Sequence, residues 1–185
     1  MKNILISLII VLGILFIGGC SIISFRNSLI NKEEVIAQQW SEIENQLQRR
    51  YDLIPNLVNT VKGYSKHEES VFKSIAEARS MMYNAKGINA KAEAEASMNS
   101  ALSRLMAIAE NYPELKANEN FIRLHNEISG TENRIAVARK RYNDAVKSFN
   151  SSIRQIPGCF FGFTAKEYYN PPARGKMETA PKVEF

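Results

Sequence analysis

Residues 121–149 read FIRLHNEISGTENRIAVARKRYNDAVKSF, and this stretch decides the fold class. Apolar or small residues recur along it in alternating steps of three and four, which places them on one face of a helix. They are Phe121, Leu124, Ile128, Thr131, Ile135, Ala138, Tyr142, Ala145 and Phe149. The pattern predicts one long amphipathic helix that needs a partner of similar length to cover its apolar face. Gly130, inside it, is expected to allow the close approach of a neighbouring helix.

A second long seam with the same spacing lies earlier in the chain. Its residues are Ile36, Trp40, Ile43, Leu47, Ile54, Leu57 and Val61. Arg50 takes the seam position where a further apolar residue would fall, so its charge must find a partner or reach solvent. Pro55 removes one helical hydrogen bond and is expected to kink this helix or to start a new one. Gly63 is expected to end it.

Two shorter amphipathic segments lie between the long ones. Ser65 and Glu68 have the spacing of a capping box, so the first segment is expected to begin with Ser65 as its N-cap. The core-facing residues of the two segments are expected to be Val71, Ile75, Ala78 and Met82, and then Met98, Leu102, Leu105 and Ala109. Four helical segments joined by short breaks predict an all-α fold, an antiparallel four-helix bundle over residues 26–150 with long first and last helices.

The N-terminal residues 4–25 contain no charge and are bounded by Lys2 and Arg26. A helix of this length crosses a hydrocarbon core of about 30 Å. Residues 1–25 are therefore expected to be a membrane anchor or a lipoprotein signal. Three alternatives stay open: an uncleaved transmembrane helix, a cleaved secretory signal, or a lipoprotein signal. In the last, Cys20 ends a sequence similar to a bacterial lipobox and would carry the lipid. The charge ahead of the apolar run favours an extracytoplasmic bundle at the bacterial cell membrane, although this orientation is weakly specified.

The C-terminal residues 151–185 form a tail of different character. Its apolar part contains Phe160, Phe161 and Phe163, is punctuated by glycine, and has no helical period. Aromatic side chains in such a segment indicate docking, either onto the bundle itself or onto a membrane or partner surface. The three phenylalanines are the docking candidates.

Six charged residues on the two long helices form the other candidate site. They are Arg49, Arg50, Asp52, Glu132, Arg134 and Arg139. An antiparallel arrangement of the helices would bring Arg50 near Glu132. One interpretation is an ion-pair network that fixes the register of the helices, which is the best-attested use of such pairs. The other is an arginine cluster that binds a partner or a phosphate group.

Composition and motifs exclude several classes of function. Lys and Arg exceed Asp and Glu by 24 to 19, but the charge is not concentrated in the basic stripe that nucleic-acid binding needs. Two cysteines and two histidines do not give a zinc-binding spacing. The sequence has neither a phosphate-binding glycine loop nor a nucleophile elbow. We therefore expect no enzyme, no cofactor, no metal and no small-molecule substrate.

Two functional hypotheses remain. The first is a membrane-tethered scaffold or adaptor with protein partners or with further copies of itself. The alternative is a membrane-shaping or envelope-structural protein that self-assembles on the bilayer surface, helped by the aromatic tail and the positive charge balance.

Three motifs of the sequence are specific enough to compare with known families: RRYDLIPNLV at residues 49–58, YPELKA at residues 112–117 and ENRIAVAR at residues 132–139. They resemble motifs of the LemA family of bacterial membrane proteins. The tail is similar too, with Phe161-Gly162-Phe163 and with Tyr168 near the place where the family has a further aromatic residue, although Ile156 stands where the family more often has Phe. The resemblance implies an N-terminal membrane segment and a long helical bundle. It brings no catalytic activity, cofactor or substrate.

Overall fold

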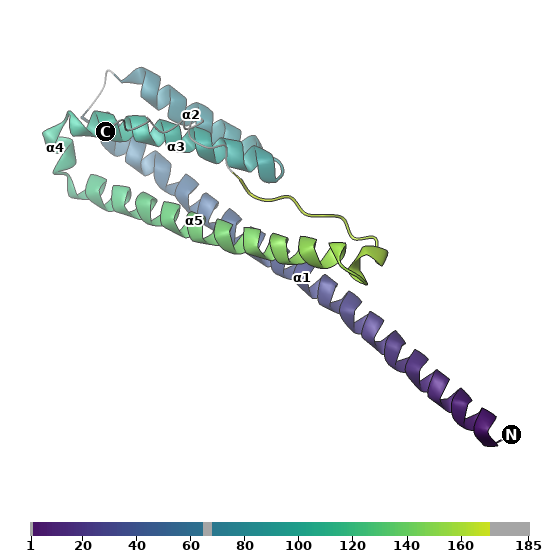
Figure 1. Ribbon diagram of the computed structural model, residues 1–185. Coiled ribbons are helices and arrows are strands. Elements are labelled where there is room, and N and C mark those ends of the chain that lie inside the picture. The colour runs from purple at the N-terminus through teal and green to yellow at the C-terminus, as the bar shows by residue number, and fades with distance from the viewer. Residues whose placement is uncertain (1, 65–67, 171–185) are drawn as a thin grey trace, which may run out of the picture. The chain divides into compact units, whose positions relative to one another are not determined.

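The computed structural model describes residues 2–64 and 68–170, and over these residues the chain is all-α, as predicted (Figure 1). The side chains of residues 1–8, 10, 11 and 14 also lie outside the described residues. The elements are α1 (Lys2–Lys62), α2 (Glu69–Asn84), α3 (Ile88–Glu110), α4 (Pro113–Lys116), α5 (Glu119–Arg154) and the 3-10 turn η1 (Gly158–Phe160).

The two long helices, α1 and α5, bury the seams that the spacing predicts. Every residue of the α1 seam is buried except Trp40, which is half-buried. In α5 only Ala145 of the predicted seam is half-buried, and Val146 and Ile153 join the core. Pro55 lies within α1, so it does not start a new helix, and α1 ends one residue before Gly63, as expected. Helical spacing alone therefore identified most of the core.

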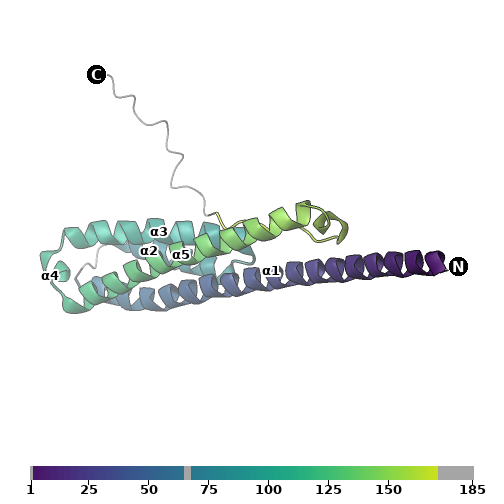
Figure 2. The same ribbon diagram turned by 60° about the horizontal axis from the view of Figure 1, so that its bottom comes forward.

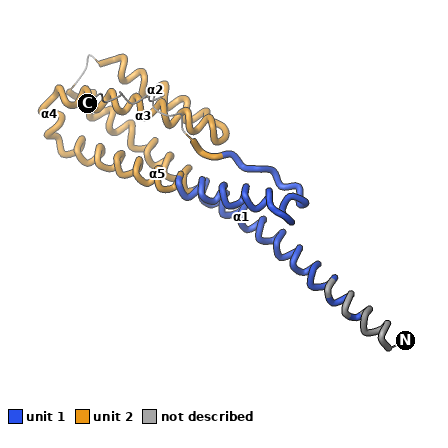
Figure 3. Tube along the Cα trace, in the orientation of Figure 1, with its two compact units in different colours: residues 1–41, 140–167 blue, residues 42–139, 168–185 orange. Residues whose placement is uncertain are grey.

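The chain divides into two compact units (Figure 3). Unit 1 holds residues 1–41 and 140–167. Within it α1 packs against α5: the Lys32 Nζ atom donates to Ser152 Oγ at 2.6 Å, and the Trp40 and Tyr142 rings lie 5.6 Å apart. Because a rising residue number in α1 meets a falling one in α5, the two helices run antiparallel here.

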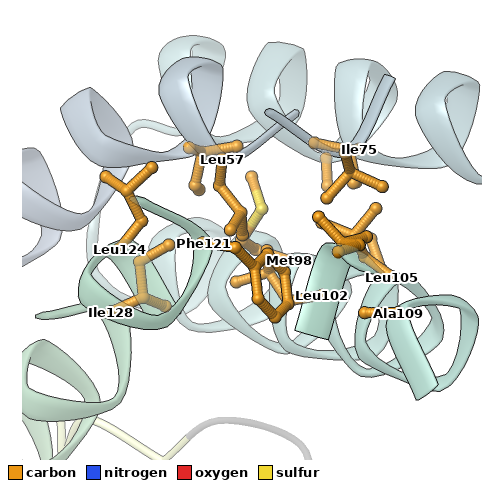
Figure 4. Close-up of a cluster of buried hydrophobic side chains, with 14 residues drawn as sticks. Leu57, Ile75, Met98, Leu102, Leu105, Ala109, Phe121, Leu124 and Ile128 are labelled. Carbon is orange, nitrogen blue, oxygen red and sulfur yellow. The ribbon is translucent and has the colours of Figure 1, made fainter. Parts of the chain in front are cut away.

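Unit 2 holds residues 42–139 and 168–185, of which those beyond 170 and residues 65–67 lie outside the described part. Helices α2 and α3 form a hairpin in it. Figure 4 shows apolar side chains of four helices facing one another in its core, among them Leu57, Ile75, Leu105 and Leu124. The short α4, which the sequence did not predict, adds the fully buried Leu115 to this core.

Two local predictions need correction. Helix α2 begins at Glu69 with Glu68 as its N-cap, not at the predicted capping box, and Ser65 lies outside the described residues. The Glu68 carbonyl accepts hydrogen bonds from the Val71 and Phe72 amides, so the backbone itself closes the first turn. At Gly130 an added Cβ would meet only a guanidinium of its own helix, at 3.6 Å. The expected close approach of another helix is therefore wrong for this position.

After α5 the chain reverses at η1 and runs back beside α5 as an extended segment (Figures 1 and 2). Helix α5 continues to Arg154, past the bundle boundary predicted at residue 150. Among the described residues no helix is both long and apolar enough to span a bilayer. The predicted anchor, residues 1–25, falls partly on residues whose side chains lie outside that description.

Candidate functional site

The aromatic tail docks on its own chain with two of its three phenylalanines. In unit 1 the Phe163 ring meets the Phe149 ring edge-on, with centroids 5.8 Å apart. The Phe161 ring stacks on Phe25 of α1 at 6.2 Å. Phe160 stays 78% exposed. The three docking candidates therefore differ: Phe161 and Phe163 hold the tail to the helices, whereas Phe160 faces outward.

Polar contacts fix the extended segment along α5. The buried Asn150 donates from Nδ2 to the Lys166 carbonyl at 2.9 Å, and its Oδ1 accepts from the Lys166 amide at 2.8 Å. One side chain thus pairs with the backbone as a neighbouring strand would. The Tyr142 hydroxyl donates to the Glu167 carbonyl at 3.0 Å, and burial, followed by the Glu167 charge, raises the pKa of Tyr142. The Lys166 ammonium lies 2.5 Å from the Glu33 carboxylate of α1.

In unit 2 the tail contacts a buried carboxylate through Tyr169. Tyr169 has no exposed surface, and its hydroxyl donates to Glu95 Oε2 of α3 at 2.6 Å. Glu95 is itself only 4% exposed. Burial raises the pKa of Tyr169 far above its usual range, the Glu95 charge and hydrogen bond add to this, and the charge of Arg139 opposes it. At neutral pH the tyrosine is therefore a fixed donor to the carboxylate.

Arg50 is a buried cation in the same unit. Its side chain is 4% exposed, and its Nη2 atom lies 3.5 Å from Glu132 Oε2 of α5. Burial lowers the pKa of Arg50, and the charges of Glu132 and Glu95 oppose this effect. Its Nε and Nη1 atoms have no hydrogen-bond partner among the described residues. A small cavity of about 10 Å³, lined by both Arg50 and Glu95, adjoins them.

The remaining charged candidates pair separately along the helix surfaces. Arg49 bonds to Glu127 at 2.8 Å, and Arg134 donates from Nε to Gln46 Oε1 at 3.2 Å, both between α1 and α5. Asp52 instead accepts a hydrogen bond from Gln48 within α1 at 2.8 Å. The six residues therefore do not form one cluster. The structure brings Arg50 to Glu132, and it places the charge of Arg139 near Tyr169.

Sequence reasoning missed Glu95 and Tyr169. Glu95 precedes Met98 by three residues and so lies on the core-facing side of α3, a signal that was available. Tyr169 had no comparable signal. The family resemblance pointed to Tyr168, which is 41% exposed.

A surface groove of about 360 Å³ lies over unit 2. It is lined by residues of α1, by the end of α2 and by Lys91 at the start of α3. Lys91 pairs with Glu44, which also lines the groove. Tyr83, another lining residue, is 81% exposed. No group of side chains among the described residues could hold a metal ion, and both cysteines, Cys20 and Cys159, are free and exposed.

Comparison with known proteins agrees with the resemblance seen in the motifs. The LemA family model matches residues 39–185. Magnetosome protein MamQ 2 of Paramagnetospirillum magneticum is 24% identical over 179 residues, and MamQ of Magnetospirillum gryphiswaldense is 25% identical over the same length. Both alignments cover 80% of this chain but only 66% of the relative, just under two thirds of its length. Protein LemA of Metamycoplasma hominis is 27% identical over 129 residues, which cover 69% of this chain and 59% of that protein.

Proposed function

This chain belongs to the LemA family, and we propose that it is a membrane-tethered, non-catalytic scaffold or adaptor of the bacterial envelope. Its architecture in this proposal is an antiparallel four-helix bundle that acts through protein–protein contacts. Residues 1–25 are the tether, either as a helix in the bilayer or through a lipid on Cys20. The bundle lies on the extracytoplasmic side.

The observation that carries the proposal is the exposed apolar surface at the start of α1. Seven large apolar side chains between residues 9 and 23 are 51% to 74% exposed. Burying one such side chain is worth about 1.5–3 kcal/mol, so leaving seven in water is strongly unfavourable. A contiguous exposed patch of this kind indicates a membrane or a partner surface. The length of the uncharged run, residues 4–25, favours a membrane over a partner protein as the surface that covers these side chains.

The adaptor role is supported by the groove of unit 2. Tyr83 and Met82 at the end of α2 line this groove, and Tyr83 is 81% exposed. Aromatic and methionine side chains are enriched in protein interfaces. The groove between them and α1 offers a concave surface for a partner or a second copy. The names of the relatives, magnetosome protein MamQ and protein LemA, mention no substrate, and we propose none.

Intact mass of the native protein tests the tether. A lipid on Cys20 gives a mass without residues 1–19 and with a lipid increment, which Cys20→Ser abolishes and the control Cys159→Ser retains. An uncleaved helix gives the full-length mass, and the protein then floats with membranes. A water-soluble product that lacks residues 1–25 and carries no lipid would overturn the tether.

Copurification from detergent extracts tests the adaptor role. We expect the full-length protein to elute with a defined partner or as a homo-oligomer, and Tyr83→Ala to weaken that complex. Ile122→Ala is the matched control, because Ile122 is a 44% exposed apolar residue of α5 that does not line this groove. A strict monomer without partners would count against the role.

One observation favours the alternative, a membrane-shaping protein. Ile156 and Phe160 expose apolar side chains in unit 1, the unit that contains the predicted anchor. Reconstitution of the full chain at increasing density into liposomes separates the two proposals. Tubulated or constricted vesicles would support shaping, whereas unchanged vesicles at high density would remove it.

A further inference from the structure

The turn that follows α5 exposes two large apolar side chains. Ile156 is 80% exposed and Phe160 is 78% exposed, although the turn between them is packed against the helix. Large apolar groups at such exposure are unfavourable in water, so a surface that covers them would be stabilising. They are close in sequence, and both belong to unit 1.

The turn holds these side chains in place. Gly158 is buried, and a Cβ atom there would collide with the carbonyl oxygen of Ser152 in the last turns of α5. The Cys159 amide donates to the Gln155 carbonyl at 3.1 Å, and the Phe160 amide to the Pro157 carbonyl at 3.1 Å. The backbone of the turn is therefore held against the end of α5, and the Phe160 side chain points away from it into solvent.

The turn also lies beside the end of the uncharged run of α1. Phe161, next to Phe160, stacks on Phe25 with the two ring planes 20° apart. Phe25 is the last residue of the uncharged run and directly precedes Arg26. It lies about 7.5 Å along the helix axis from Cys20, at 1.5 Å per residue. A helix that leaves the bilayer after Phe25 and a lipid on Cys20 both place Phe25 close to the membrane surface.

Charge around the turn agrees with an anionic bilayer. Arg154 ends α5, Arg26 follows Phe25, and both are exposed. Basic side chains close to an anionic leaflet are attracted to its headgroups, while Trp, Tyr and Phe side chains favour the boundary between headgroups and acyl chains. The turn therefore combines two apolar side chains with flanking positive charge.

We propose that the turn of residues 155–161 inserts Ile156 and Phe160 into the headgroup region of the membrane that holds α1. The inference rests on the proposed tether and deepens it. It makes the turn a second attachment point, so that unit 1 meets the membrane at two places. Phe161 and Phe163 pack against the helices, and Phe160 inserts into the bilayer.

Tryptophan fluorescence in reconstituted vesicles tests the turn. The full-length chain carries Trp40→Phe and Phe160→Trp, and the vesicles contain zwitterionic and anionic phospholipids brominated either near the headgroup or deep in the acyl chain. We expect emission at shorter wavelength, and a loss of most of the emission with the shallow bromines. Ile156→Trp in the same background is expected to behave alike.

Val35→Trp is the matched control within unit 1. Val35 is 44% exposed and lies ten residues beyond Phe25 on α1, or about 15 Å further along the helix axis. Its tryptophan is expected to emit at long wavelength and to keep its intensity with either bromine position. Helix content by circular dichroism verifies that each variant is folded.

The outcomes separate the turn from the tether. If the protein does not float with the vesicles, the tether fails. If it floats but the tryptophans at 156 and 160 emit and quench like the one at 35, the turn proposal is wrong. A short-wavelength emission that resists both bromines and grows with protein density would show that a second copy covers the turn, and it would also overturn the proposal.

Discussion

Removing the hydroxyl group of Tyr169 measures how much this side chain stabilises the docking of the tail in unit 2. The side chain is fully buried, and its hydroxyl donates to Glu95 at 2.6 Å. Tyr169→Phe keeps the ring and deletes the hydrogen bond to Glu95. The Glu95 carboxylate, 4% exposed, then loses a donor that water cannot readily replace.

The expected loss follows from the type of bond. A hydrogen bond to a charged group contributes about 1.5–3 kcal/mol, and an unsatisfied buried acceptor adds a cost of its own. Because the Arg50 cation also acts on Glu95, we expect the lower part of this range, about 2 kcal/mol. Tyr169→Ala also empties the ring site and should lose about 3–5 kcal/mol.

Two measurements report this loss. Chemical denaturation of the detergent-solubilised protein gives the free energy of unfolding, and hydrogen exchange over residues 160–170 detects local release of the tail. Local release is expected first, because the segment can leave without unfolding the helices. Tyr168→Phe is the matched control, since the neighbouring tyrosine is 41% exposed and its loss should stay within about 0.5 kcal/mol.

The reasoning is refuted if Tyr169→Phe changes neither the free energy of unfolding nor the exchange of the tail. Glu95→Gln provides an independent check, because the amide oxygen still accepts the hydrogen bond but as a neutral group. Its effect combined with Tyr169→Phe should be less than the sum of the single effects. Strict additivity would mean that the two side chains do not interact.

Three further predictions follow from the same contacts. Arg50→Met is expected to lower the free energy of unfolding by about 3 kcal/mol, because it removes the cation that pairs with Glu132 and is attracted by the charge of the buried Glu95. Adding Glu95→Gln should recover part of the loss, and thermal melting measures both. Gly158→Ala is expected to destabilise by at least about 1–3 kcal/mol through overpacking, and an unchanged melting temperature would contradict the close contact. Tyr142 and Tyr169 should each ionise above the usual range of a tyrosine in an absorbance titration. Since folding raises both pKa values, the unfolded chain loses these protons first, and stability falls as pH rises above about 10.

Helical spacing predicted the core of this protein well because burial of a helix face leaves a periodic trace in the sequence. Ile43, Leu57 and Leu105 were identified from their spacing alone, and each has no exposed surface. The seam also identified Arg50 as a charge at a core position. Neither conclusion required knowledge of which helices are neighbours in space.

The tail could not be predicted in the same way, because an extended segment that docks on helices carries no period of its own. Tyr168 and Tyr169 are adjacent and of one type, yet only Tyr169 is buried. What distinguishes them is Glu95, which lies 74 residues away in the sequence. For the same reason the three phenylalanines appeared equivalent until Phe25 and Phe149 were seen to face two of them. Which aromatic side chain of the tail is buried depends on its contact partner, and a single sequence does not reveal that partner.

The buried charges of unit 2 contribute more to the register of the helices than to stability. Burial is the largest influence on the pKa of Arg50 and lowers it, so desolvation outweighs the attraction of Glu132 and Glu95. A protein with well-packed apolar side chains in place of Arg50, Glu132 and Glu95 would often be as stable or more stable. An apolar seam, however, tolerates a shift of α1 along α5 by a turn, whereas a cation that pairs with Glu132 on α5 and is attracted by the charge of Glu95 on α3 does not. Tyr169 depends on the same carboxylate. We therefore expect this charge network to fix the register of the helices and the position of Tyr169, more than it stabilises the fold. The adaptor role that we propose would depend on that register, because it requires surfaces of fixed shape.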